Sequence, residues 1–92
     1  MHVVAQHRIV DRDRFAAMDP KDVALGGPPG VRALTFYPSR DLTAAICLWE
    51  APTVEAVRDY VDPVTAGVAE NTYFAIEDAM AIGLPAPAGA GA

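Results

Sequence analysis

The stretch VRALTFYPSRDLTAAICLWEAPTVEAVRDYV, residues 31 to 61, decides the predicted fold. Two segments rich in apolar and β-branched residues, 31–38 and 42–50, lie on either side of the short polar turn PSRD. Such segments are typical of β-strands, and a turn this short joins neighbouring antiparallel strands. The first part of the stretch therefore predicts a β-hairpin.

The second part of the stretch predicts a helix. Valines recur at helical spacing through residues 54–61, and Pro52 or Thr53 supplies the start of the helix. We expect Pro63 to end it, because the residue before a proline is disfavoured in the helical conformation. The whole stretch thus predicts strand, strand and helix in that order.

The N-terminal part of the chain predicts a strand followed by a broken helix. Residues 2–9 alternate between inward and outward positions as a strand does. Asp11 is a suitable N-cap for a helix that Pro20 interrupts. Asp19 and Pro20 then form the cap and first position of a second helical turn, which we expect to carry Val23 inward, with Leu25 as a second candidate.

The C-terminal part of the chain predicts a fourth strand and a tail. Residues 71–76, NTYFAI, are rich in aromatic and branched side chains. The order strand, helix, strand, strand, helix, strand predicts an α+β, ferredoxin-like fold with a four-stranded antiparallel sheet and two helices on one face. We expect one domain over residues 1–82, and a flexible Pro/Gly/Ala tail over residues 83–92.

The two strands of the hairpin are apolar on both faces. Two short helices cover only one face of a sheet, so the other face exposes on the order of several hundred Å² of apolar surface. A symmetric homodimer with two sheets face to face, a dimeric α+β barrel, is the simplest way to cover it. Strict alternation in the first hairpin strand gives two groups: Val31, Ala33, Thr35 and Tyr37 against Arg32, Leu34 and Phe36.

Composition argues against several classes of protein. Of the 92 residues, twelve are acidic and seven basic, giving a net charge of −5, and no basic stripe is present to follow a nucleic-acid backbone. No apolar run approaches the roughly 20 residues of a membrane span, and the alternating N-terminus does not resemble a signal-peptide core. We expect a soluble, cytoplasmic protein with no nucleic-acid or membrane partner.

The chain offers few residues for catalysis or metal binding. His2 and His7 are five residues apart, which places them on opposite faces of a strand, so they cannot share a metal. The GGPPG segment lacks the lysine and following helix of a phosphate-binding loop, and we expect no cofactor. His7 is the candidate catalytic residue, as a general base in a cavity; the alternative is a partly buried histidine with a backbone partner.

The segment CLWEAPTVEAVR, residues 47–58, resembles a family of small bacterial domains of uncharacterised function that read Cys-Leu-x-Glu-Ala-Pro at this junction. The resemblance implies a dimeric α+β-barrel fold, and the best-known members of that family bind nickel. His7 matches a histidine that those proteins often carry. Residues 16–25 and 58–67 lack the further histidines of the family, so the resemblance does not extend to nickel binding. A looser similarity, in topology alone, links the chain to antibiotic-biosynthesis monooxygenases.

Several aromatic or soft side chains near strand ends are candidate ligand-binding residues. They are either core and interface anchors or the walls of a flat apolar cavity between sheet and helices. The set comprises Phe36, Tyr37, Cys47, Trp49 and Tyr73.

Three functions remain open from the sequence. The first is a dimer that binds a small hydrophobic ligand. The second is a cofactor-independent monooxygenase, isomerase or cyclase for an aromatic or polyketide-like substrate, with His7 as base and with Trp49 and Tyr37 as walls. The third is a metal carrier, although we expect no metal site.

Overall fold

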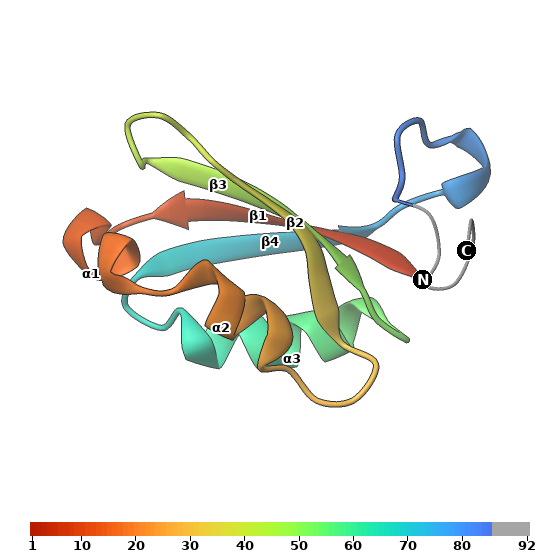
Figure 1. The fold of residues 1–92 in the computed structure, drawn as a ribbon, viewed down its shortest axis with the longest axis horizontal. Coiled ribbons are helices and arrows are strands. Elements are labelled where there is room, and N and C mark those ends of the chain that lie inside the picture. The colour runs from red at the N-terminus through yellow and green to blue at the C-terminus, as the bar shows by residue number, and fades with distance from the viewer. Residues whose placement is uncertain (86–92) are drawn as a thin grey trace.

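The structure, a computed structural model, describes residues 1–85 and contains one four-stranded sheet with helices on one face (Figure 1). The strand order is β2-β3-β1-β4, and every neighbouring pair is antiparallel. This confirms the predicted ferredoxin-like α+β fold. The elements are β1 (His2–Ile9), α1 (Arg12–Ala17), α2 (Pro20–Leu25), β2 (Arg32–Pro38), β3 (Ala44–Glu50), α3 (Val54–Val64), β4 (Ala69–Ala75) and the 3-10 helix η1 (Asp78–Met80).

The three α-helices begin where the sequence predicts. Asp11, Asp19 and Thr53 are the N-caps, and each side-chain oxygen accepts a hydrogen bond from a backbone N–H two or three residues later. Pro20 is the first residue of α2, where its missing N–H costs nothing. The first helical region is therefore two helices of six residues each. Among residues 1–85, no helix is long and apolar enough to cross a membrane.

Two helical predictions are wrong. Helix α3 does not stop before Pro63 but runs to Val64, because a proline in the last turn removes only one hydrogen bond while the buried Val57 and Val61 anchor the helix. Leu25 does not point inward and is 74% exposed. It follows the half-buried Val23 by two residues, a rotation of about 200° around the helix axis.

A β-bulge in β2 changes which side chains share a face. The pairing of β2 with β3 shifts between Ala33 and Thr35, which adds one residue to β2. Beyond the bulge Phe36 is opposite Cys47, so Phe36 joins Ala33 on the face that the helices cover. Tyr37 is turned to the other face and is exposed. The prediction that Ala33 and Tyr37 share a face is therefore wrong.

The core lies between the sheet and the helix layer, on what we call the helix face. Helix α3 packs against β1 and β4, and α2 packs against β2. Neither α1 nor α2 contributes a fully buried residue, so most of the core comes from the sheet and α3. The core comprises Val3, Ala5, Val31, Cys47, Trp49, Ala51, Val57 and Val61.

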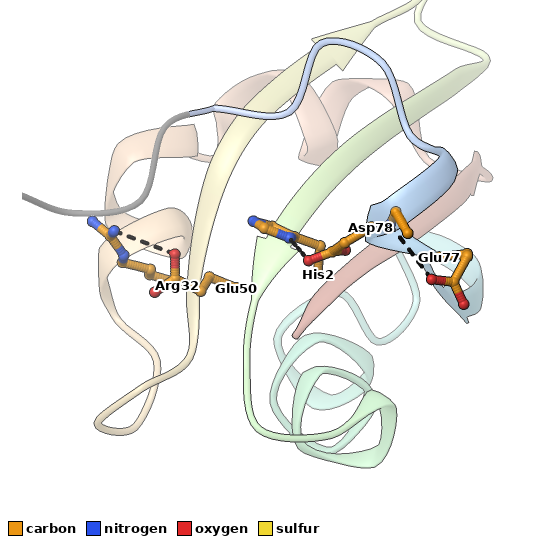
Figure 2. Close-up of polar contacts among 6 residues, drawn as sticks. His2, Arg32, Glu50, Glu77 and Asp78 are labelled. Carbon is orange, nitrogen blue, oxygen red and sulfur yellow. Dashed lines mark hydrogen bonds and ion pairs between the residues drawn. The ribbon is translucent and has the colours of Figure 1, made fainter. Parts of the chain in front are cut away.

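The opposite side, the open face, is covered by none of the three α-helices, and η1 lies at one end of it, where Asp78 contacts His2 (Figure 1 and Figure 2). Ion pairs lie at its ends: His2 with Asp78 at 3.0 Å and Arg32 with Glu50 at 3.5 Å (Figure 2), and a third between β1 and β4. Between these ends it exposes apolar side chains. The large ones are Tyr37, Ile46 and Phe74.

Residues 83–92 were predicted to form a flexible tail. Of these, residues 86–92 lie outside the described residues. The flexibility of the tail stays a prediction.

Replacing Val57 by alanine tests the helix-face core. Val57 is fully buried, so Val57→Ala is expected to lower the free energy of unfolding by about 2 kcal/mol through lost burial and a residual cavity. Val64→Ala, on the same helix at 39% exposure, is the matched control and is expected to cost under about 0.5 kcal/mol. Urea unfolding followed by circular dichroism measures both; equal losses would contradict this placement of the core.

Candidate functional site

A cavity of about 200 Å³ lies between the sheet and the two short helices α1 and α2. Its outer wall includes the exposed Ala16 and Pro20, and its inner wall the buried His7, Cys47 and Trp49. The cavity exists because two helices of six residues, broken at Pro20, fill less space over the sheet than one longer helix. The remaining lining is Phe15, Met18, Val23, Ala24, Ala33, Phe36, Pro38, Leu42, Val61 and Thr65.

The polar part of the wall is a chain of side chains from three adjacent strands. The Nε2 atom of His7 (β1) lies 2.8 Å from the Sγ atom of Cys47 (β3), and its Nδ1 atom lies 2.6 Å from Oδ1 of Asn71 (β4). Asn71 is directly opposite His7 in the β1–β4 ladder. Cys47 is opposite Ala5, two residues before His7, and so is the diagonal neighbour of His7 on the same face.

The hydrogen bonds of Asn71 determine which nitrogen of His7 carries the proton. Both hydrogens of the Asn71 amide nitrogen are used, one toward Asp62 Oδ1 at 3.0 Å and one toward Thr65 Oγ1 at 2.8 Å. Its Oδ1 must therefore accept a hydrogen bond from Nδ1–H of His7. The unprotonated Nε2 is then free to accept the Cys47 S–H.

Two further contacts hold this chain of side chains in place. The Thr65 hydroxyl donates to the backbone carbonyl of Val61 at 2.9 Å, and the Tyr73 hydroxyl donates to Asp62 Oδ1 at 2.6 Å. Hydrogen bonds from Tyr73 and Asn71 lower the pKa of Asp62, which keeps it ionised. Asn71 is thus fixed from the α3 side, and so is the ring of His7.

Burial keeps both His7 and Cys47 uncharged. Desolvation lowers the pKa of His7, with the Asn71 hydrogen bond and the Asp62 charge acting in the opposite direction. Desolvation raises the pKa of the Cys47 thiol to about 11, and a hydrogen bond from the Trp49 indole N–H to the thiolate form opposes this increase. With the neutral thiol the same N–H makes no hydrogen bond. At neutral pH the pair is therefore a thiol and a neutral imidazole.

Trp49 supplies an unused hydrogen-bond donor. Its side chain is only 2% exposed, and its Nε1–H has no partner within residues 1–85. A buried donor left without a partner costs about 1–3 kcal/mol. Because Trp49 lines the cavity beside Cys47, a bound molecule with an acceptor atom would satisfy this donor.

The structure brings together four of the six predicted site residues. His7, Phe36, Cys47 and Trp49 line the cavity. Tyr37 does not, because the β2 bulge turns it to the open face. Tyr73 lies on the helix face of β4 but contacts Asp62 instead of the cavity.

Sequence reasoning missed the residues that orient His7. Asn71 and Thr65 were not singled out, and His7 has side-chain partners where the alternative to a catalytic role gave it a backbone partner. Asn71 could have been found from the predicted fold, since the fourth strand pairs with the first and an asparagine there faces the helix side. Its exact pairing with His7 depends on the strand register, which the sequence pattern does not give.

Within residues 1–85, no group of three or more His, Cys, Asp and Glu side chains is arranged to hold a metal ion. His2 lies on the open face with Asp78, away from His7. No family model, curated protein or solved structure matches the chain. The resemblance of residues 47–58 to the Cys-Leu-x-Glu-Ala-Pro family therefore stays a prediction.

The buried imidazole makes stability depend on pH. The pKa of His7 is lower in the folded chain than the ordinary value of about 6.5. The stabilisation that the neutral imidazole gives to the folded state is therefore complete above about pH 6.5 and is lost as the pH falls through the folded pKa. Lowering the pH from about 7.5 to about 5 is therefore expected to reduce the free energy of unfolding. Urea unfolding at a series of pH values measures the slope.

Two variants assign that slope. His7→Gln is expected to flatten it, whereas Val64→Ala, which changes no titratable group, is expected to keep it. A wild-type free energy that stays constant or rises over this range would contradict the burial of a neutral His7.

Proposed function

We propose that this protein is a homodimer that binds a small, mainly apolar molecule with one hydrogen-bond acceptor in the cavity between the sheet and helices α1 and α2. The observation that carries the proposal is the unpaired Nε1–H of the buried Trp49, in a mainly apolar wall whose other polar side chains already have hydrogen-bond partners. Ligand sites of this kind combine an apolar lining with a few polar groups that fix orientation.

The size of the cavity limits the ligand. An apolar cavity of about 150 Å³ is enough for benzene, so about 200 Å³ is enough for one aromatic ring with a short substituent. Phe15 and Phe36, whose ring centroids are 5.9 Å apart, supply part of an aromatic wall. The volume favours a single ring over the larger polyketide-like ring systems expected from the sequence.

The polar groups of the wall favour an acceptor on that ring. His7, Cys47 and Thr65 already have hydrogen-bond partners, so Trp49 is the lining side chain with an unused donor within residues 1–85. A carbonyl or ether oxygen placed there gains one buried hydrogen bond, a net effect of about 1 kcal/mol.

A pair of ligands of nearly equal shape tests the role of Trp49. Acetophenone carries a carbonyl oxygen, and ethylbenzene lacks one. Trp49→Phe removes the N–H but keeps an aromatic ring, so it is expected to weaken acetophenone binding about fivefold relative to ethylbenzene. Isothermal titration of wild type and variant with both ligands gives the ratio.

A second variant shows where the ligand sits. Ala24, on α2, is half-buried and lines the cavity, so Ala24→Phe fills the space and is expected to weaken both ligands alike. If wild type binds neither ligand, or if Trp49→Phe weakens both ligands by the same factor, the proposed site is wrong.

The open face supports the dimer. Tyr37, Phe74 and Ile46 are 63%, 48% and 39% exposed on a sheet face that no α-helix covers. Apolar side chains grouped on one sheet face favour a partner with the same surface, and a two-fold symmetric pair places this face against its own copy. Because the cavity lies on the other side of the sheet, the dimer leaves it accessible.

A charge placed in the open face is expected to separate the subunits. Ile46→Glu buries a carboxylate at the proposed interface and should convert a dimer into a monomer in sedimentation equilibrium. Leu25→Glu, at a 74% exposed position on the helix layer, is the control and should leave the dimer intact. A wild-type monomer at micromolar concentration would contradict the proposal.

The other functions stay predictions with less support. A cofactor-independent enzyme with His7 as base toward the ligand requires a free Nε2, but that atom accepts from Cys47. A metal carrier requires ligands beyond the Cys47–His7 pair. A cytoplasmic location is supported by the single cysteine, which cannot form an internal disulfide.

A further inference from the structure

The contact between Cys47 and His7 joins a nucleophile to a base at the cavity wall. The Sγ–Nε2 distance is 2.8 Å, and both side chains line the cavity. Asn71 holds the other nitrogen of the ring, at 2.6 Å from Nδ1. A thiol, an imidazole and an amide linked in this order have the roles of nucleophile, general base and orienting group.

The unpaired donor of Trp49 adds the fourth part of a site for carbonyl addition. Its indole lies beside the thiol, with the Nε1–H unused in a side chain only 2% exposed. When a nucleophile adds to a carbonyl group, negative charge develops on the oxygen, and a buried N–H directed at that oxygen stabilises it. The donor is therefore of the type that such an addition requires.

We propose that Cys47 adds reversibly to the carbonyl carbon of an aromatic aldehyde bound in the cavity, with His7 as its general base and Asn71 as a positioning residue. The inference rests on the proposed function, because the aldehyde is a ligand of that same cavity. It makes the protein a covalent binder of reactive aldehydes.

The addition is complete without any further reactant. The Sγ–C bond forms as the π bond of the C=O group breaks, and the thiol proton passes to Nε2 of His7. The same proton then moves from His7 to the alkoxide oxygen, which gives a neutral thiohemiacetal. The reverse sequence releases the aldehyde and restores the thiol.

The resting protonation states give this mechanism a characteristic pH dependence. A buried thiol without a base reacts through its thiolate, so its rate rises about tenfold per pH unit toward a pKa of about 11. With neutral His7 taking the proton during attack, the rate depends on the fraction of neutral imidazole. It is therefore flat above neutral pH and falls only in acid.

Within residues 1–85, His7 and Cys47 are the titratable side chains that line the cavity. Tyr73 on β4 lies outside the lining but near enough to Cys47 for a thiolate to raise the pKa of its hydroxyl. Cys47 on β3 contacts His7 directly, and Asp62 on α3 acts on it through Asn71. Helices α1 and α2 contribute only apolar side chains to the lining: Phe15, Ala16, Met18, Pro20, Val23 and Ala24.

The adduct is tested directly with benzaldehyde labelled with ¹³C at the carbonyl carbon. Wild type is expected to show a tetrahedral carbon signal by NMR in addition to the free carbonyl signal. Cys47→Ala is expected to lose the tetrahedral signal, whereas Val64→Ala, on α3 outside the cavity lining, is expected to keep it. If wild type binds acetophenone but forms no adduct, the nucleophile inference is wrong and the binding proposal stands; if it binds neither compound, both are wrong.

The role of His7 is tested with phenyl vinyl ketone, which alkylates the same thiol irreversibly. Intact-mass spectrometry gives the rate of modification between about pH 6 and about pH 9. Wild type is expected to give a flat profile, and His7→Gln is expected to react about 100-fold more slowly at pH 7, with a rate that rises with pH. A wild-type rate that rises tenfold per pH unit would overturn the base role, and this measurement needs no variant.

The role of Asn71 is tested by two variants. Asn71→Leu removes the acceptor for Nδ1–H and is expected to slow the reaction about tenfold. The second variant combines Asn71→Asp with Asp62→Asn, because a carboxylate at position 71 would otherwise face the Asp62 carboxylate across 3.0 Å. It keeps an acceptor for Nδ1–H and is expected to retain the flat region, with the fall in acid moved to higher pH because the negative charge now contacts the imidazole directly. Identical profiles for the two variants would show that Asn71 does not position His7.

Discussion

The antiparallel pairing of β1 with both β3 and β4 is the constraint on which the site depends. The β1–β4 pairing places Asn71 directly opposite His7. The β1–β3 pairing places Cys47 opposite Ala5, and therefore diagonally next to His7 on the same face. Side chains alternate between faces with a period of two, so a slip of one residue in β1 would turn His7 to the open face. Hydrophobic burial of Val3 and Ala5, both fully inaccessible, fixes this register.

The helix layer explains why a cavity exists above these strands. Helix α3 brings Val57 and Val61 down onto the sheet, whereas α1 and α2 are too short to bury a residue completely. Their break at Pro20 leaves apolar space between helix and sheet. The helices above this space shield the Trp49 indole and the Cys47 thiol from water, but within residues 1–85 they give the indole N–H no hydrogen-bond partner. Loose packing and an unsatisfied donor thus have a common local cause.

The two faces of the sheet separate the proposed chemistry from the proposed association. The helix face buries the histidine, the thiol and the tryptophan, whose protonation and hydrogen bonding depend on exclusion of water. The open face carries exposed apolar groups in its middle and ion pairs toward its ends. The β2 bulge contributes to this separation, because it keeps Phe36 on the helix side and sends Tyr37 to the other.

The sequence by itself determined the order of elements, the three helix N-caps and the hairpin. These depend on contacts within a few residues: a side-chain cap, a proline at a helix start, a polar turn. It also determined that Cys47 and Trp49 share one face of their strand, because alternation is a local property. Only the tertiary structure decided that Cys47 contacts His7, that Asn71 orients the ring, and that Tyr37 is excluded. The contacts of His7 with Cys47 and Asn71 depend on the register between strands, because these residues are 40 and 64 positions away from His7 in the chain. The exclusion of Tyr37 depends on a one-residue bulge, which no periodic pattern encodes.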